Sequence, residues 1–226
     1  MLIVAAYILA TFPILESKEI PETVQRSVLA ATVQILNPEA KKEGSGVLIG
    51  IREGQGFILT ARHVVAEARQ WEVRFFEDES YPKSVLRVGK TSLLIQNQDA
   101  DLALLRVDLK GVKNLPKPLK IRKEALKEKE FLAFSSGGSG TASPTLEPLQ
   151  IQGRKLLTRP DRSSAFFWQS REAPEEGRSG GPLVDLRGNL IGICSGKQEE
   201  KGYYTALEEI RSWLEKSDHA WILEEK

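Results

Sequence analysis

The chain has 226 residues, of which 41% are hydrophobic, enough apolar side chains for one large core or two smaller ones. Its 32 basic and 31 acidic residues give a formal net charge of +1, so it lacks the strong positive field typical of nucleic-acid-binding proteins. The single cysteine, Cys194, excludes an intrachain disulfide and a cysteine-based metal site. We expect neither a metal nor an organic cofactor.

An apolar stretch occupies residues 2–15 and is interrupted only by Thr11 and Pro13. Its length suits the hydrophobic region of a signal peptide and is too short for a membrane-spanning helix. No basic segment precedes it and no clear cleavage site follows it. We predict that residues 1–20 are a signal peptide or an N-terminal anchor and that the protein is exported, to the periplasm or the outside. The alternatives are a strand or helix docked on the core and a cytoplasmic location.

Short strand-like runs begin near Thr32, rich in β-branched and aromatic residues and bracketed by Gly, Pro, Asn or Asp. The first series comprises residues 31–36, 45–51, 56–60, 71–76, 81–88, 92–96 and 102–107. The second comprises residues 130–135, 149–157, 165–169, 181–185, 190–195 and 203–206. The sequence Arg187-Gly188-Asn189 predicts a hairpin turn between two of the latter runs. Many short strands at regular spacing favour an all-β barrel or sandwich.

Helix signals are scarce. Residues 64–69 predict a short helical turn, and the polar, proline-containing connection at 109–128 predicts another short helical piece. Residues 207–216 have an apolar spacing of three and four that suits an amphipathic helix, through Leu207, Ile210, Trp213 and Leu214.

A glycine-rich loop, Glu176-Gly177-Arg178-Ser179-Gly180-Gly181-Pro182, stands out in the second series. Gly177 and Gly180 permit a sharp turn that exposes the Ser179 hydroxyl. The same turn can point the backbone N–H groups of Gly177 and Ser179 into one small space, which is how an oxyanion hole lies beside a nucleophile. An isolated loop of this kind is also compatible with a β-turn in which the serine is only a cap.

A serine nucleophile needs a base, and the base needs an orienting group. His63 follows an apolar run that ends at Thr60, so it is placed at the end of a rigid strand; the only other histidine is His219. Asp101 directly precedes the run 102–107, where a partly buried carboxylate must find hydrogen-bond donors such as an imidazole N–H. Asp99 is the weaker candidate, because it is better placed as a turn residue.

The order His63, Asp101, Ser179, with the first two in one series and the serine in the other, resembles the chymotrypsin-like serine proteases. The similarity is closest to the bacterial HtrA/Deg type, through residues 44–49, 60–65, 101–105, 177–193 and 203–214. It covers roughly residues 24–216 and rests on several motifs together.

The resemblance implies an all-β fold of two six-stranded antiparallel β-barrels with a C-terminal helix. Residues 21–120 would form the N-terminal barrel, and residues 121–226 the C-terminal barrel with the nucleophile. It also implies a serine endopeptidase that forms an acyl-enzyme intermediate. Ser179 would attack, His63 would be the general base and then acid, and Asp101 would orient the imidazole, with the N–H groups of Gly177 and Ser179 as the oxyanion hole.

The same resemblance places Ser195 and Gly196 on the strand beside the substrate, and Ala173 and Pro174 at the primary specificity pocket. No acid occupies the base of that pocket, so we expect a small or apolar residue before the cleaved bond rather than Lys or Arg. The implied partners are polypeptide substrates, and a homo-oligomer such as a trimer is compatible. Because the chain ends shortly after the terminal helix, we expect no PDZ domain.

The family usually has Asn or Asp where this chain has Arg178. We expect activity to tolerate this difference, because the oxyanion hole is made of backbone groups. One alternative is an α/β-hydrolase, but that fold needs a helix after the serine and its acid and histidine downstream of it. Here Pro182 and an apolar strand follow the serine. The other alternative is a catalytically silent protease fold that binds extended peptides.

Overall fold

The computed structural model describes residues 20–37, 42–66, 70–76, 84–127, 129–138, 143–158 and 162–224. The prediction of a signal peptide or anchor at residues 1–20 therefore lies almost wholly outside the described residues. Within the described ranges, no helix is both long and apolar enough to cross a bilayer.

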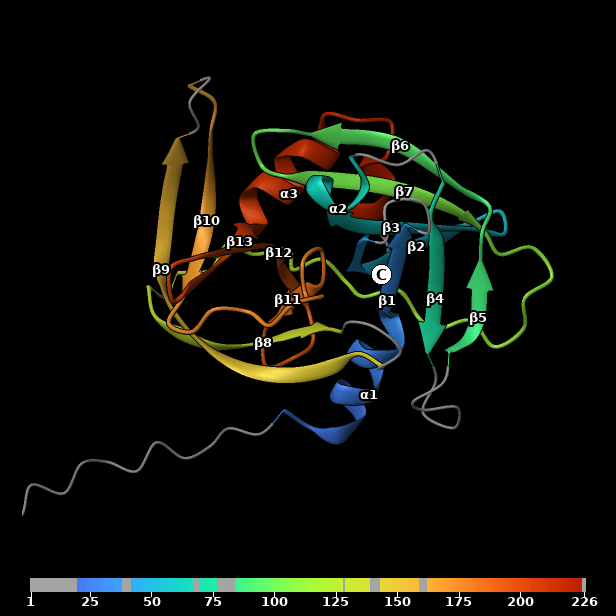
Figure 1. Ribbon diagram of the computed structural model, residues 1–226, viewed down its shortest axis with the longest axis horizontal. Helices are drawn as coiled ribbons and strands as arrows, with labels where there is room; N and C mark the ends of the chain where they lie inside the picture. The colour runs from blue at the N-terminus through green and yellow to red at the C-terminus, as the bar shows by residue number, and fades with distance from the viewer. Residues whose placement is uncertain are drawn as a thin grey trace, which may run out of the picture.

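The first half of the chain forms a seven-stranded antiparallel sheet, drawn on the right of Figure 1. Its strands lie in the order β5-β4-β1-β2-β3-β7-β6. They are β1 (Thr32–Asn37), β2 (Lys42–Arg52), β3 (Gln55–Ala61), β4 (Glu72–Phe76), β5 (Ser84–Val88), β6 (Thr91–Asn97) and β7 (Leu102–Asp108). Each of the seven runs expected from the sequence contains a strand, and residues 81–83 of the run 81–88 lie outside the described residues.

This sheet is curled rather than closed. Its two edge strands, β5 and β6, are consecutive in the chain and separated only by Gly89 and Lys90. Two residues span only a few ångströms, so the edges must come close together. The resemblance implies a six-stranded barrel in this half, and the structure instead has a half-barrel of seven strands.

The second half forms a closed six-stranded barrel in the order β10-β13-β12-β11-β8-β9, on the left of Figure 1. Its strands are β8 (Phe131–Gly137), β9 (Thr145–Thr158), β10 (Ser164–Ser170), β11 (Pro182–Val184), β12 (Leu190–Gln198) and β13 (Lys201–Ala206). Each corresponds to one predicted run. The chain is thus all-β in the manner expected, with the serine loop between β10 and β11.

The described residues contain four helical segments beside the strands: α1 (Glu22–Ala31), α2 (Arg62–Val65), α3 (Leu207–Glu215) and the 3-10 turn η2 (Ala220–Leu223). The structure confirms the amphipathic terminal helix, because α3 buries Leu207, Ile210 and Leu214. The sequence reading missed α1, which buries Val28 and Ala31 at a spacing of three and runs directly into β1.

The connection at 109–127 is extended, and the short helical piece expected there is absent from its described residues. Leu119 and Ile121 are buried, and Ile121 pairs with Leu190 of β12 as a parallel bridge. Leu119 N–H also donates to Leu48 O of β2 at 2.9 Å. The segment is held straight because it joins both halves by backbone hydrogen bonds, which a helical turn would use internally.

The largest apolar cluster lies between the two halves. It combines Val47, Leu59 and Leu102 of the first sheet with Phe134, Phe167 and Ile193 of the barrel, and with the buried face of α3. Each half also has a cluster of its own. Burial of a shared core fixes the two halves against each other, and the loops at their junction are thereby held in place.

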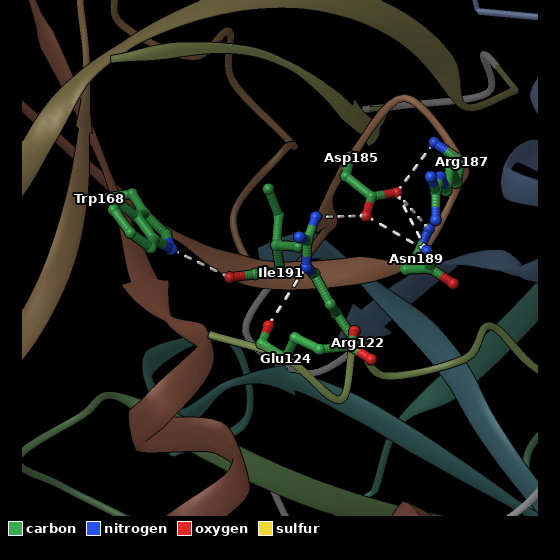
Figure 2. Close-up of polar contacts among 7 residues, drawn as sticks. All are labelled: Arg122, Glu124, Trp168, Asp185, Arg187, Asn189 and Ile191. Atoms are coloured by element: carbon green, nitrogen blue, oxygen red, sulfur yellow. Dashed lines mark hydrogen bonds and ion pairs between the residues drawn. The ribbon is translucent and has the colours of Figure 1, made fainter. Parts of the chain in front are cut away.

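The predicted hairpin turn between β11 and β12 is present and is organised by one buried carboxylate (Figure 2). Asp185 Oδ1 accepts the backbone N–H groups of Arg187 and Asn189, both at 2.9 Å. Arg122 Nη1 lies 3.0 Å from Asp185 Oδ2 and ties the 109–127 connection to the same turn. Gly188 takes φ +78°, a conformation that glycine adopts without strain.

We predict that Asp185→Ala lowers the free energy of unfolding by about 3 kcal/mol, because it leaves the Arg122 guanidinium half-buried and unpaired. Glu22→Gln is the control. It removes an exposed ion pair with Arg26 and is expected to cost at most about 0.5 kcal/mol. Urea denaturation followed by circular dichroism measures both. Equal losses in the two variants would contradict this account of the turn.

Candidate active site

His63 is held against Asp101 by two hydrogen bonds. Asp101 Oδ2 lies 2.8 Å from His63 Nδ1, and Asp101 Oδ1 accepts the His63 backbone N–H at 3.0 Å. His63 is the second residue of the short helix α2, which follows β3 directly, and its side chain is 45% exposed. When Nδ1–H donates to the carboxylate, Nε2 of the neutral ring is an acceptor.

Asp101 is buried, and its donors come from both halves of the molecule. Ser195 of β12 donates its hydroxyl to Asp101 Oδ2 at 2.5 Å. Thr205 of β13 donates to the carbonyl of the preceding residue, Ala100, at 2.6 Å. Asp101 itself takes φ +54°, a strained backbone that Asp tolerates better than most residues. This strain turns the carboxylate back toward α2, and the surrounding donors fix it there.

The loop that carries Ser179 is fastened to the first sheet by Ser45 of β2. Ser45 N–H donates to Ser179 O at 2.7 Å, and Ser45 Oγ donates to Gly177 O at 2.7 Å. Gly180 lies so close to this strand that a Cβ there would overlap Ser45 O and Thr60 Oγ1. The glycine is therefore required for the approach of the two halves as well as for its own φ of +84°.

The serine loop carries the two peptide N–H groups that the sequence predicted as an oxyanion hole, those of Gly177 and Ser179. Arg178 N–H donates to Glu175 O at 3.4 Å, and Gly177 takes φ +84°, so residues 175–178 form a type II turn. Gly181 N–H donates to Arg178 O at 2.8 Å. Because the Arg178–Ser179 peptide is trans, its N–H group, that of Ser179, points in the opposite direction, away from Gly181. Neither Gly177 N–H nor Ser179 N–H has an acceptor among the described residues.

The backbone of Ser179 lies close to Val64, the residue after His63. A Cβ placed on Gly44 would be 2.9 Å from Ser179 O and 2.8 Å from the γ-methyl groups of Val64, the neighbour of His63. No hydrogen bond joins Ser179 Oγ to His63 among the residues that the structure describes. Hydrogen bonds between catalytic groups are often long before substrate binds, so a missing bond is compatible with the two groups acting together.

The other predicted site residues lie beside this point. Ser195 and Gly196 line an open groove of about 410 Å3. Its remaining lining residues are Leu156, Leu157, Thr158, Phe167, Lys197, Gln198 and Tyr203. Pro174 is buried near Gly202 of β13, and Ala173 is half-buried. The ring of His219 lies against that of Phe57 in a tilted arrangement and does not contact Asp101. Asp99 is exposed, and the sequence preference for Asp101 over Asp99 agrees with the observed hydrogen bonds.

Sequence reasoning missed two groups that hold this site together. Ser45 was identified only as part of a family-like motif, and its bonds to the serine loop depend on the pairing of β2 across the junction. Ser195 was expected to border the substrate through its backbone, and the bond from its hydroxyl to Asp101 was not foreseen. The local sequence carries no signal for either bond, because both partners are about a hundred residues away or more.

A protein-family model, "Trypsin-like peptidase domain", matches residues 44–193. The probable periplasmic serine endoprotease DegP-like of Ectopseudomonas mendocina is 35% identical over 158 residues, which cover 70% of this chain and 30% of the relative. The serine protease Rv3671c of Mycobacterium tuberculosis is 27% identical over 213 residues, covering 87% of this chain and 49% of the relative. The chain thus spans between about a third and a half of the length of these relatives.

Crystal structures of the Mycobacterium tuberculosis Rv3671c protease superpose on this chain with a TM-score of 0.67 at 24% identity. The superposition on the inactive form covers 85% of this chain and 91% of the solved chain. The superposition on the active form covers 85% of this chain and 83% of the solved chain. At this identity the likeness concerns the fold. The active and inactive forms match equally well.

Cys194 lies on the strand next to Ser195 and is not a reactive group. Burial is the largest influence on its thiol and raises the pKa to about 12. The thiolate is the nucleophile in cysteine chemistry, and at pH 8 it amounts to only about one part in 10⁴ at such a pKa.

We therefore predict that Cys194 in the folded protein does not react with 5,5′-dithiobis(2-nitrobenzoate) at pH 8 on the timescale of minutes, and that it reacts completely in guanidinium chloride. Absorbance of the released thionitrobenzoate measures both. Rapid reaction of the native protein would show that the strand β12 is not packed as described.

Proposed function

Because the chain belongs to the trypsin-like peptidase family, we propose that it is a serine endopeptidase that forms an acyl-enzyme on Ser179. The observation that carries this proposal is the junction of the two halves, where one buried carboxylate holds an imidazole and a fastened glycine loop presents a serine beside it. The proposal concerns the domain in hand. The relatives that share its motifs are all longer than this chain.

In the proposed first step, His63 Nε2 takes the proton of Ser179 Oγ while that oxygen attacks the carbonyl carbon of the substrate. The electron pair of the carbonyl moves to its oxygen, which the N–H groups of Gly177 and Ser179 stabilise; each such donor contributes about 3 kcal/mol. Asp101 keeps Nδ1 protonated and stabilises the imidazolium that forms. The tetrahedral intermediate then collapses: the electron pair returns from the oxygen, the C–N bond breaks, and the imidazolium gives its proton to the leaving amine. Water, deprotonated by His63, then attacks the acyl-enzyme, and the bond from the carbonyl carbon to Ser179 Oγ breaks as the serine regains its proton.

An extended substrate fits the groove beside β12. The backbone of Ser195 and Gly196 borders it, and an added strand pairs with such an exposed backbone while side chains occupy alternate pockets. Pro174 and Ala173 present no charge to the residue before the cleaved bond, which supports a small or apolar preference there. Phe167 and Tyr203 give the groove apolar walls farther along.

Location and assembly stay predictions. The DegP-like relatives are named as periplasmic, which supports export of this chain. The apolar stretch that prompted the prediction lies within residues 1–19, outside the described residues.

The proposal is tested by labelling the folded protein with a fluorophosphonate and mapping the adduct by peptide mass spectrometry. Ser179 is expected to carry the phosphonyl group, and Ser179→Ala is expected to abolish labelling. Ser212→Ala, on the half-buried face of α3, is the control that should label like the wild type. A folded wild-type protein with no adduct on Ser179 would support the silent peptide-binding alternative.

We also predict that Asp101→Asn lowers kcat on a peptide substrate by about 10⁴-fold while KM changes by less than about threefold. An amide at this position stabilises the wrong imidazole tautomer, which lowers kcat by about 10⁴-fold in a Ser-His-Asp triad. Asp99→Asn is the matched control on the same turn and is expected to retain activity within about threefold. A loss below tenfold for Asp101→Asn would contradict the assigned role.

A further inference from the structure

Arg178 lies between the two residues whose N–H groups form the proposed oxyanion hole, yet its side chain points away from the substrate. It is 1% exposed and is the largest fully buried side chain of the molecule's described part. A charged side chain is almost never buried to this extent unless it is paired. Its position in the loop and its burial together require an explanation.

The guanidinium is anchored in the barrel behind the loop. Arg178 Nη1 donates to Ser135 O of β8 at 2.9 Å, and Nη2 donates to Thr145 Oγ1 at the start of β9 at 2.5 Å. Nη2 also forms an ion pair with Glu147 of β9, whose side chain is 40% exposed. The fork of the guanidinium thus reaches two neighbouring strands, a geometry that a lysine ammonium cannot reproduce.

The backbone of Arg178 links this anchor to the proposed oxyanion hole. Its carbonyl accepts Gly181 N–H, and the other end of that peptide is the Ser179 N–H. Its own N–H closes the turn from Glu175, whose central peptide carries the Gly177 N–H. The Cα of Arg178 also lies against Gly137, where a Cβ would be 2.9 Å from it. A change of the loop that displaces Arg178 Cα would break the contacts of the buried side chain with β8 and β9.

We propose that Arg178, with Glu147 as its charge partner, is a positioning residue that holds the serine loop in the conformation with both N–H groups directed at the substrate. This deepens the proposed function and rests on it. It replaces the expectation that Arg178 is neutral because the oxyanion hole is made of backbone. The backbone groups are chemically generic, and the buried ion pair determines where they point.

A purely structural ion pair is the alternative, and the chain offers a matched control for it. Arg122 pairs with the buried carboxylate of Asp185, at 3.0 Å, and forms no hydrogen bond or ion pair with residues 175–181 in the described part of the chain. Arg122→Met removes the charge partner of Asp185, and Arg178→Met removes that of the partly exposed Glu147. Only the second variant is expected to change the serine loop.

The test compares Arg178→Met, Arg178→Lys, Glu147→Gln and Arg122→Met in the full chain. The first readout is the second-order rate of fluorophosphonate labelling at Ser179, together with kcat and KM on a peptide substrate. We expect Arg178→Met to lower the labelling rate and kcat by about 100-fold or more, the effect of one lost oxyanion donor, with KM nearly unchanged. Arg178→Lys and Glu147→Gln are expected to lose about tenfold, and Arg122→Met less than about threefold.

The second readout does not depend on activity. Hydrogen exchange, followed by mass spectrometry of peptides that cover residues 175–181, reports the bonds from Gly180 N–H to Cys194 O and from Gly181 N–H to Arg178 O. We expect faster exchange there in the Arg178 and Glu147 variants and wild-type exchange in Arg122→Met. Thermal unfolding identifies any variant that fails to fold, and the milder Lys and Gln variants then carry the comparison.

The outcomes separate the two proposals. Absence of labelling in the wild type contradicts the proposed function, and the exchange data alone then decide the positioning role. The opposite result is a folded Arg178→Met variant that is labelled at the wild-type rate and shows unchanged hydrogen exchange. That result overturns the positioning role and leaves the proposed function intact. Equal losses in Arg122→Met and Arg178→Met would show a general loss of stability and would also overturn it.

Discussion

The buried carboxylate of Asp101 is the constraint on which the junction of the two halves depends. A carboxylate removed from water must receive hydrogen bonds, and here they come from His63 in the first half and Ser195 in the second. The two halves can therefore meet in only one way, the way that satisfies these oxygens. The same arrangement that relieves the cost of burial fixes the orientation of the imidazole, so stability and the geometry of the site have a common origin.

The serine loop depends on a second set of contacts across the same junction. Ser45 binds both carbonyls that neighbour Arg178, while Gly180 permits the close approach that those bonds require. The turn at Gly177 then sets one N–H group, and the bond from Gly181 to Arg178 sets the other. None of these contacts involves a special side-chain chemistry. Preorganised backbone dipoles are effective because they need not reorient when charge develops on the substrate.

The sequence predicted every strand, because alternating and β-branched runs separated by turn residues are local signals. It also identified His63, Asp101 and Ser179, whose flanking patterns are local too. It missed α1, whose two buried residues are too few for a clear helical period, and it expected a helical piece in 109–128 where tertiary hydrogen bonds keep the chain extended. The contacts of Ser45, Ser195 and Arg178 depend on residues far away in the chain. Their partners become visible only when the two halves are folded together.

The crystal structure of the protein carrying a phosphonyl group on Ser179 tests the central claim most directly. The account predicts that a phosphonyl oxygen lies about 2.7–3.1 Å from the backbone nitrogens of both Gly177 and Ser179, with Gly177 still at positive φ and Arg178 still paired with Glu147. A loop in which the Glu176–Gly177 peptide is reversed, with its carbonyl directed at the phosphonyl group, would contradict it.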